Sequence, residues 1–389
     1  MKSKAILISL GVPDRLKIIR DILSKEYDVR IYISDFSHAK KEYIKDKDKD
    51  PECNYIHVLN YKKNISIKRI LSYIFFAKSI SKILKNKHPK LIYVMLPPNI
   101  IANKCKEYKL KHSNVILIVD VYDLWPESLP IKYVKKHATF LLSIWKKVRT
   151  SVLKKSDYIF TECNYYRKVI GADVLPENKT SVLYIHKEQS PQVRELVLSS
   201  IENYHLKKNI LCFGYLGGIN NIIDIKNITE AMEQLVSYGY AITVKIIGDG
   251  ESRKEFIDSL KKVGANVEYF GIIFDNKRKA RILCECDYAL NMMVDDIIVG
   301  LTTKSVDYLS LGIPLFNNIK EDTWDLVEKE QIGVNYSGNI ENLIKNLSEE
   351  KIKQEKKNAL EYFDNFLTSS SLKNHVRNEF IKHGIINKW

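Results

Sequence analysis

The chain of 389 residues is long enough for two domains of about 150 residues each, and either half can bury a core. Its hydrophobic content of 45% and charged content of 28% are typical of a folded soluble protein. The 62 Lys and Arg against 47 Asp and Glu give a net charge of +15, which indicates an anionic partner: nucleic acid, a phosphate-bearing substrate or an acidic membrane surface. No run of about 18 apolar residues occurs, so no membrane-spanning helix is expected.

The six cysteines are scattered, and we expect them to be reduced, mostly buried thiols of a cytosolic protein. Cys284 and Cys286 are close in sequence, but their spacing is not that of a zinc knuckle. The apolar stretch 5–10 runs directly into Gly11 and Pro13, so it is too short for the core of a signal peptide.

The first half predicts a doubly wound α/β domain. Residues 4–10 are a mostly apolar strand closed by Gly11, residues 15–24 have helical spacing, and residues 29–33 resume as strand. A glycine at this edge lets backbone approach a ligand, so Gly11 is a candidate on the acceptor side. Further strands are predicted at 91–96, 115–119, 158–160 and 181–185.

Two carboxylates follow the predicted strand at 115–119. Asp120 and Asp123 lie just past its end, where α/β enzymes place catalytic groups, so both are candidate catalytic residues. The alternative is that one of them caps a turn before Pro126.

Two basic amphipathic segments are predicted in the first half, at 65–87 and 131–155. Each is either an ordinary core-packing helix with a solvated face or a helix that also rests on anionic lipid. Two such segments in one half favour the membrane-surface interpretation.

A second βα series begins after residues 187–208, the predicted crossing between domains. A strand at 209–213 leads into a loop at 214–218, where Gly217 and Gly218 allow phosphate or a sugar ring to meet backbone. A helix is expected at 224–238, and strands at 244–247, 267–270 and 288–291, the first of which ends at Gly248.

The stretch 299–314 is predicted to be a loop, two turns of helix and a stop at Gly312 and Pro314. Thr302 and Thr303 are available to cap the helix start, which attracts anions. Lys304 in the first turn opposes the helix dipole unless a bound phosphate compensates it, and Asp307 lies one turn on, suited to ribose hydroxyls. The alternative is a capped surface helix with an internal ion pair.

The end of the chain is predicted to be helical at 341–365 and 372–382. We therefore expect a first Rossmann-like domain at 1–190, a second at 209–365, and a helical segment at 366–389 that is a candidate to pack back on the first domain.

The second half resembles the donor-binding half of the GT-B glycosyltransferases, specifically the retaining family 4 type. The residues that carry the resemblance are FGYLGG at 213–218, IIGDG at 246–250, VEYFG at 267–271, CDYA at 286–289 and KSVDYLSLGIP at 304–314. In the first half, DVYDLWPES at 120–128 is similar to a segment of bacterial enzymes that build lipid-linked surface polysaccharides. The resemblance implies two Rossmann-like domains facing a cleft.

By this resemblance, Asp307 takes the place of the carboxylate that holds the donor ribose, Lys304 lies near the diphosphate, and Gly217 and Gly218 form the glycine loop. The family has an acidic residue eight positions before the ribose carboxylate, where this chain has Val299.

A second departure follows the glycine loop. The family often places Arg and Lys there, and this chain has Ile219, Asn220 and Asn221. Arg253 and Lys254 are candidate substitutes.

The resemblance implies transfer of a sugar from a nucleoside diphosphate donor, with a UDP-sugar favoured, to a lipid-linked or oligosaccharide acceptor in capsule, O-antigen or other surface polysaccharide synthesis. Lys304 and the start of its helix would stabilise the leaving diphosphate, and Asp123 or Asp120 would position the acceptor. We expect no metal and no bound cofactor beyond the nucleotide-sugar, and a cytoplasmic location at the inner face of the plasma membrane.

Two alternatives remain: a GT-B sugar-nucleotide epimerase or hydrolase, and a catalytically silent GT-B partner subunit. A nucleic-acid partner is disfavoured, because the basic residues follow helices rather than clustering with aromatic platforms.

Overall fold

A computed structural model describes residues 2–63, 66–128, 139–295 and 297–387. The chain divides into two compact units: one contains residues 1–183 and 372–389, the other residues 184–371. The chain therefore crosses between the units twice, at 183/184 and at 371/372, where the sequence suggested 190 and 365. Within the described ranges, no helix is long and apolar enough to cross a membrane.

The first unit is built on a seven-stranded sheet in the order β5-β2-β1-β6-β7-β8-β9, in which all the strand pairs are parallel. Its strands are β1 Ser3–Ile8, β2 Tyr27–Ser34, β5 Cys53–Ile56, β6 Leu91–Leu96, β7 Ile116–Val121, β8 Tyr158–Thr161 and β9 Thr180–Val182. Every residue of the central β6 is buried, as its continuous apolar sequence requires for a strand covered on both faces. A short hairpin, β3 Phe36–Ser37 with β4 Glu42–Tyr43, stands apart from this sheet.

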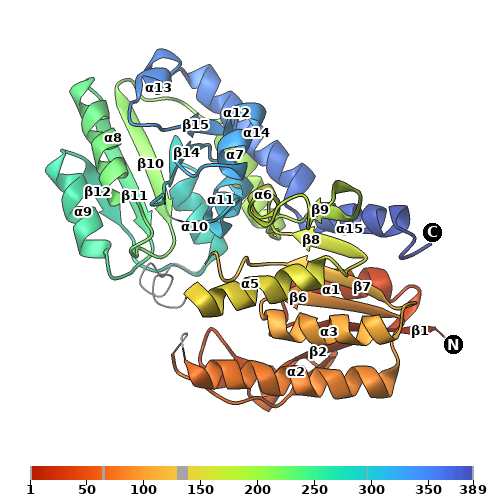
Figure 1. Cartoon of the computed structure of the whole chain (residues 1–389). Coiled ribbons are helices and arrows are strands. Elements are labelled where there is room, and N and C mark those ends of the chain that lie inside the picture. The colour runs from red at the N-terminus through yellow and green to blue at the C-terminus, as the bar shows by residue number, and fades with distance from the viewer. Residues whose placement is uncertain (1, 64–65, 129–138, 296, 388–389) are drawn as a thin grey trace. The chain divides into compact units, whose positions relative to one another are not determined.

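Helices cover both faces of this sheet (Figure 1). They are α1 Asp14–Leu23, α2 Ile67–Lys87, α3 Asn99–Lys111, α5 Thr139–Leu153, α6 Asn164–Ile170 and α15 Ser369–Lys382. On one face α3 packs against β6 and β7 and lies between α2 and α5. On the other, α15 shares a buried apolar cluster with α1, to which Val376 and Phe380 contribute. Residues 129–138, which include the start of the predicted 131–155 segment, lie outside the described residues.

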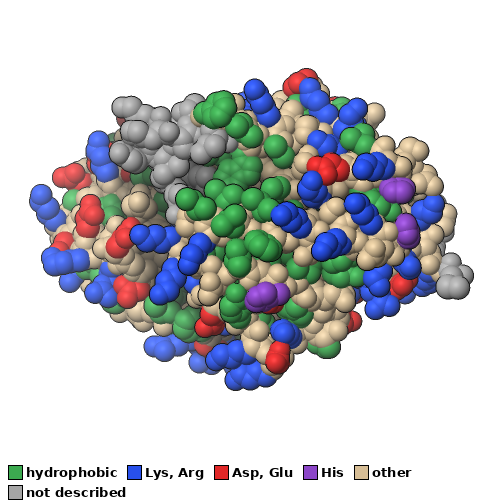
Figure 2. All heavy atoms as spheres, turned by 60° about the horizontal axis from the view of Figure 1, so that its bottom comes forward, with side chains coloured by type: hydrophobic (Ala, Val, Ile, Leu, Met, Phe, Trp, Pro, Cys, Tyr) green, Lys and Arg blue, Asp and Glu red, His purple; other side chains and the backbone are tan. Residues whose placement is uncertain are grey.

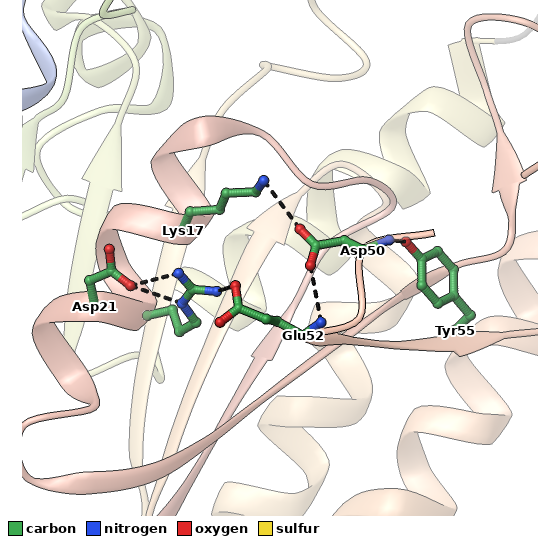
Figure 3. A network of polar contacts seen from close by, with 6 residues as sticks. Lys17, Asp21, Asp50, Glu52 and Tyr55 are labelled. Atoms are coloured by element: carbon green, nitrogen blue, oxygen red, sulfur yellow. Dashed lines mark hydrogen bonds and ion pairs between the residues drawn. The ribbon is translucent and has the colours of Figure 1, made fainter. Parts of the chain in front are cut away.

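A polar network ties the edge strand β5 to α1 (Figure 3). Lys17 of α1 pairs with Asp50 at 3.1 Å, and Arg20 pairs with Glu52. The backbone N–H of Asp50 donates to the Tyr55 hydroxyl at 2.7 Å. These contacts hold the turn before β5 against the helix.

The second unit is built on a six-stranded parallel sheet in the order β12-β11-β10-β13-β14-β15. Its strands are β10 Ile210–Leu216, β11 Ala241–Ile247, β12 Asn266–Tyr269, β13 Tyr288–Asn291, β14 Leu315–Asn317 and β15 Gly333–Asn335. Its helices are α7 Pro191–Glu202, α8 Ile225–Ser237, α9 Arg253–Lys262, α10 Asn276–Leu283, α11 Thr303–Ser310, α12 Asp322–Glu330, α13 Glu341–Lys345 and α14 Glu349–Phe366. Apolar clusters fill both sides of the sheet. The doubly wound α/β architecture expected for both halves is confirmed.

The structure differs from the sequence-based expectation in several segments. Asp120 lies within β7 rather than past the end of its strand, and the strand predicted at 181–185 is β9, Thr180–Val182. Residues 187–208 contain α7, which Ser190 caps and whose Val193, Val197 and Ile201 are buried at helical spacing. The strand β10 continues to Leu216, so the predicted loop begins only at Gly217. The helix predicted at 341–365 is interrupted, because Ser348 caps a new helix start.

Candidate functional site

The start of α11 lies at the carboxyl edge of the second unit's sheet and has the cap that its sequence predicts. The Thr302 hydroxyl accepts a hydrogen bond from the backbone N–H of Ser305 at 2.9 Å. The Ser305 hydroxyl in turn donates to Asn291 Oδ1, at the end of β13, at 3.0 Å. Thr303 is the first helical residue and is exposed. The cap therefore fixes the helix start against the neighbouring strand and leaves its open end available to an anion.

Lys304 joins this helix to the loop that follows β10. Its Nζ donates to the Tyr215 hydroxyl at 2.6 Å and to the Gly218 carbonyl at 3.4 Å, and lies 4.5 Å from the centre of the Tyr215 ring. Burial lowers the pKa of Lys304 to about 8. Because these partners carry no negative charge, the ammonium gains from an anion that binds beside it.

Two glycines make the close approach of this loop possible. Gly217 has φ +123°, and a Cβ there would meet Lys304 Cε at 2.8 Å. Gly248, at the end of β11, has φ +145°, and a Cβ there would lie 1.9 Å from the Gly217 carbonyl oxygen. A Cβ at Gly217 would push the end of the Lys304 side chain aside, and a Cβ at Gly248 would displace the Gly217 backbone.

Asp307 does not pair with Lys304, although the two are one turn apart. Its Oδ1 accepts a hydrogen bond from Lys187 Nζ at 2.5 Å, and no contact between Asp307 and Lys304 is found in the part of the chain described. The internal ion pair offered as an alternative is thus replaced by a long-range one. Sequence reasoning missed Lys187, because nothing in the spacing connects residues 120 positions apart.

Arg253, a candidate for neutralising the diphosphate, already has partners. Its guanidinium pairs with Asp249 at 3.1 Å and lies 5.6 Å from the centre of the Tyr269 ring. A hydrogen bond to Tyr269 and the charge of Asp249 raise the pKa of Arg253. It is therefore less available to a phosphate than Lys304 is.

In the first unit, Asp120 is buried and fully engaged. It pairs with Arg15 at 3.1 Å and accepts a hydrogen bond from the Tyr93 hydroxyl at 2.6 Å. Arg15 also donates to the Leu183 carbonyl at 2.5 Å, which ties the end of β7 to the chain after β9. This geometry gives Asp120 an architectural role, since its carboxylate is 0% exposed. The sequence did not indicate Arg15 as its partner.

Asp123 lies three residues further on and is half-buried. Its backbone N–H donates to the Leu96 carbonyl at 3.2 Å, and its carboxylate accepts from the Ser128 hydroxyl at 2.5 Å. Of the two predicted carboxylates, Asp123 is the one that solvent reaches. At Gly11 an added Cβ would meet nothing within 4 Å, so the space beside this backbone is open.

Two arginines brace the loop that carries Asp123. Arg149 of α5 makes two bonds to Glu127, at 2.6 and 2.8 Å, and donates to the Trp125 carbonyl at 3.1 Å. The guanidinium of Arg69, on α2, lies 4.3 Å from the centre of the Trp125 ring. The loop is therefore held by the same two helices that the sequence singled out as basic and amphipathic.

In the described ranges, no group of three or more His, Cys, Asp or Glu side chains is arranged to hold a metal ion.

No family model matches the chain, and no curated protein matches it. Solved structures do. The structure of HepE from Anabaena in complex with UDP and glucose superposes with a TM-score of 0.60 at 13% identity, over 97% of this chain and 98% of that one. The lipopolysaccharide outer core galactosyltransferase WaaB gives a TM-score of 0.64 at 14% identity, over 97% and 99%. Sucrose-phosphate synthase from Thermosynechococcus elongatus gives 0.63 at 12% identity, over 99% and 100%.

These neighbours are glycosyltransferases of the GT-B fold, and they match along almost the whole of this chain. At such low identity the likeness shows the fold alone, and this chain has the GT-B fold: two Rossmann-like α/β units.

Proposed function

We propose that this protein is a glycosyltransferase that moves a sugar from a nucleoside diphosphate donor to a lipid-linked or oligosaccharide acceptor in surface polysaccharide synthesis. The favoured donor is a UDP-sugar. The observation that carries the proposal is Lys304, which lies at a capped helix start and against the Gly217–Gly218 backbone, with Asp307 one turn on. Neighbours of the same fold include an enzyme solved with UDP-glucose and a galactosyltransferase of lipopolysaccharide.

In the proposed reaction the bond from the anomeric carbon to the diphosphate breaks, and negative charge grows on the departing phosphate. Lys304 and the N–H groups at the start of α11 stabilise that charge. If configuration is retained, the acceptor hydroxyl attacks on the leaving-group face and a diphosphate oxygen takes its proton, so no protein nucleophile is required. Asp123 positions the acceptor hydroxyl, while Asp120 acts through Arg15 as a support of the sheet edge.

The decisive experiment is consumption of nucleotide-sugar by wild-type protein and by Lys304→Ala. A thermal-shift screen against UDP, GDP, dTDP, ADP and CMP first identifies the base. Lys304→Ala should abolish turnover with an unchanged circular dichroism spectrum, because the leaving group loses its cation. Lys345→Ala is the matched control, since Lys345 pairs with Glu341 on the exposed face of α13 and belongs to no proposed site. Turnover by Lys304→Ala close to that of wild type would overturn the assignment.

We also propose that the first unit rests on an anionic membrane surface. Large apolar side chains are exposed on α2 and α5, and they are accompanied by lysines of the same helices. The exposed side chains are Ile67, Ile70, Leu71 and Phe75 on α2 and Phe140 and Ile144 on α5. In the view that brings α2 forward, hydrophobic side chains gather with Lys and Arg around them (Figure 2). Because Arg69 and Arg149 of these helices also brace the Asp123 loop, a lipid-linked acceptor fits this face.

The silent-subunit alternative is supported by one observation, the Val299 that stands where the family has an acid. Steady consumption of a nucleotide-sugar separates an enzyme from such a subunit. Dependence of that consumption on an added acceptor separates a transferase from a hydrolase or an epimerase.

A further inference from the structure

We propose that Lys187 is a charge-compensating residue of the nucleotide site, which holds the Asp307 carboxylate for the ribose and cancels its charge beside the diphosphate. This inference rests on the proposed function, because it assumes that a nucleoside diphosphate binds at the start of α11.

The position of Lys187 is fixed by backbone contacts within the second unit. Its own N–H donates to the Leu367 carbonyl at 2.9 Å. Two residues later, Gln189 Nε2 donates to the Ser310 carbonyl at the end of α11 at 2.5 Å. The segment 187–189 is therefore anchored along α11, and the Lys187 side chain reaches Asp307 from an ordered backbone.

Solvent reaches both side chains of the ion pair. Lys187 Nζ lies 2.5 Å from Asp307 Oδ1, and the two side chains are 28% and 22% exposed. A narrow hollow of about 20 Å³, with room for roughly one water, is lined by Lys187, Gln189, Leu216 and Ser310. Leu216 ends the strand that leads into the glycine loop, so Lys187 stands at the same edge of the sheet as that loop.

Charge balance explains why a lysine is needed there. A carboxylate one helical turn from a bound diphosphate repels it, and the partial burial of Asp307 weakens the screening of that repulsion by water. The positions after the glycine loop, Ile219, Asn220 and Asn221, carry no charge, and Arg253 is paired with Asp249. The positive charge of Lys187 balances the negative charge of Asp307. The positive charge of Lys304 is then not offset by Asp307 and acts on the diphosphate.

The hydrogen-bonding capacity of the carboxylate allows both roles together. Lys187 uses one lone pair of Asp307 Oδ1. The second oxygen and the remaining lone pair can accept from the two ribose hydroxyls. Lys187 therefore need not leave Asp307 when the nucleotide arrives.

The test is calorimetric titration of wild type, Lys187→Met and Lys187→Arg with uridine, UMP and UDP, or with the corresponding series of the base that the screen selects. Lys187→Met should weaken UDP binding about tenfold, UMP binding less and uridine binding least, because the uncompensated carboxylate repels phosphate charge. The difference should shrink at high salt. Lys187→Arg should bind within about threefold of wild type.

Lys226→Met is the matched control, because Lys226 also pairs with a carboxylate, Glu230, at 3.7 Å, and its side chain is 83% exposed. Its affinities should equal those of wild type. Melting temperatures of all variants establish that each is folded at the titration temperature.

Three results would overturn the inference. Lys187→Met could bind UDP as tightly as wild type does, or more tightly, as expected if Lys187 competes with the nucleotide for Asp307. Its affinity could also fall equally for uridine, UMP and UDP. Binding that Asp307→Ala abolishes and Lys187→Met leaves unchanged overturns the inference alone. Wild-type protein that binds no nucleotide overturns the proposed function, and this inference with it.

Discussion

Lys304 is a cation held in a site that disfavours its charge. Burial lowers its pKa to about 8, and burial also raises the pKa of its neighbour Tyr215, so that the phenol stays neutral at physiological pH. No hydrogen bond or ion pair to a carboxylate is found for Lys304 in the described ranges. These are the features that the proposed diphosphate site requires.

Nucleotide affinity should therefore depend on pH. A bound diphosphate favours the ammonium and raises the pKa of Lys304 above its value of about 8 in the free protein. Between the free and the bound pKa, binding takes up a proton, so affinity falls as pH rises above 8, by up to about tenfold per pH unit. Titration calorimetry from pH 6.5 to 9.5 in two buffers of different ionisation enthalpy measures both the affinity and the proton uptake. Affinity that stays constant to pH 9.5 would contradict this assignment.

At the scale of elements, the helices α2 and α5 combine two properties that are usually separate. Their inner faces pack with α3, and their outer faces expose apolar side chains. Ile67 and Phe140 are each 77% exposed. Their side chains could therefore enter lipid without losing packing contacts within the protein.

We expect the wild-type protein to sediment with phosphatidylglycerol vesicles at low salt and less with neutral phosphatidylcholine vesicles, because both charge and apolar area contribute. The double variant Ile67→Ser/Phe140→Ser should bind at least tenfold more weakly, since burial of one large apolar side chain contributes about 1.5–3 kcal/mol. Phe274→Ser is the control, because Phe274 is 87% exposed but belongs to the second unit. Failure of the wild type to sediment at either salt would remove the membrane proposal.

The sequence predicted local elements better than tertiary pairs. The helix at 303–310 was evident from the Thr302 cap and the stop at Gly312, because both signals lie within a few residues of the helix. The helix α7 was missed although Ser190 and Pro191 mark its start. The partners Lys187–Asp307 and Arg15–Asp120 could not be predicted, because they are 120 and 105 residues apart and only the fold brings them together.

At the scale of the whole molecule, the first unit needs both ends of the chain. Residues 372–389 return to it after the entire second unit. Phe380 is 0% exposed, and its ring centre lies 5.9 Å from that of Phe160 on β8. The Tyr27 hydroxyl donates to the Ile385 carbonyl at 2.9 Å. The core of this unit is therefore complete only when the last helix is in place.

Phe380→Ala should destabilise the first unit by about 3–5 kcal/mol, because it removes a buried ring and leaves a cavity. Because the second unit has its own cores, scanning calorimetry should resolve two unfolding transitions. The transition temperature of the first unit should be lowered, and that of the second unit should still rise when nucleotide is added. Phe366→Ala, at a position that is 56% exposed, is the control and should change neither transition by more than about 1 kcal/mol. If Phe380→Ala instead lowered the nucleotide-stabilised transition equally, the two units would unfold as one. The proposed donor site would then depend on the end of the chain, although the contacts of Lys304 and Asp307 described above all lie within residues 184–371.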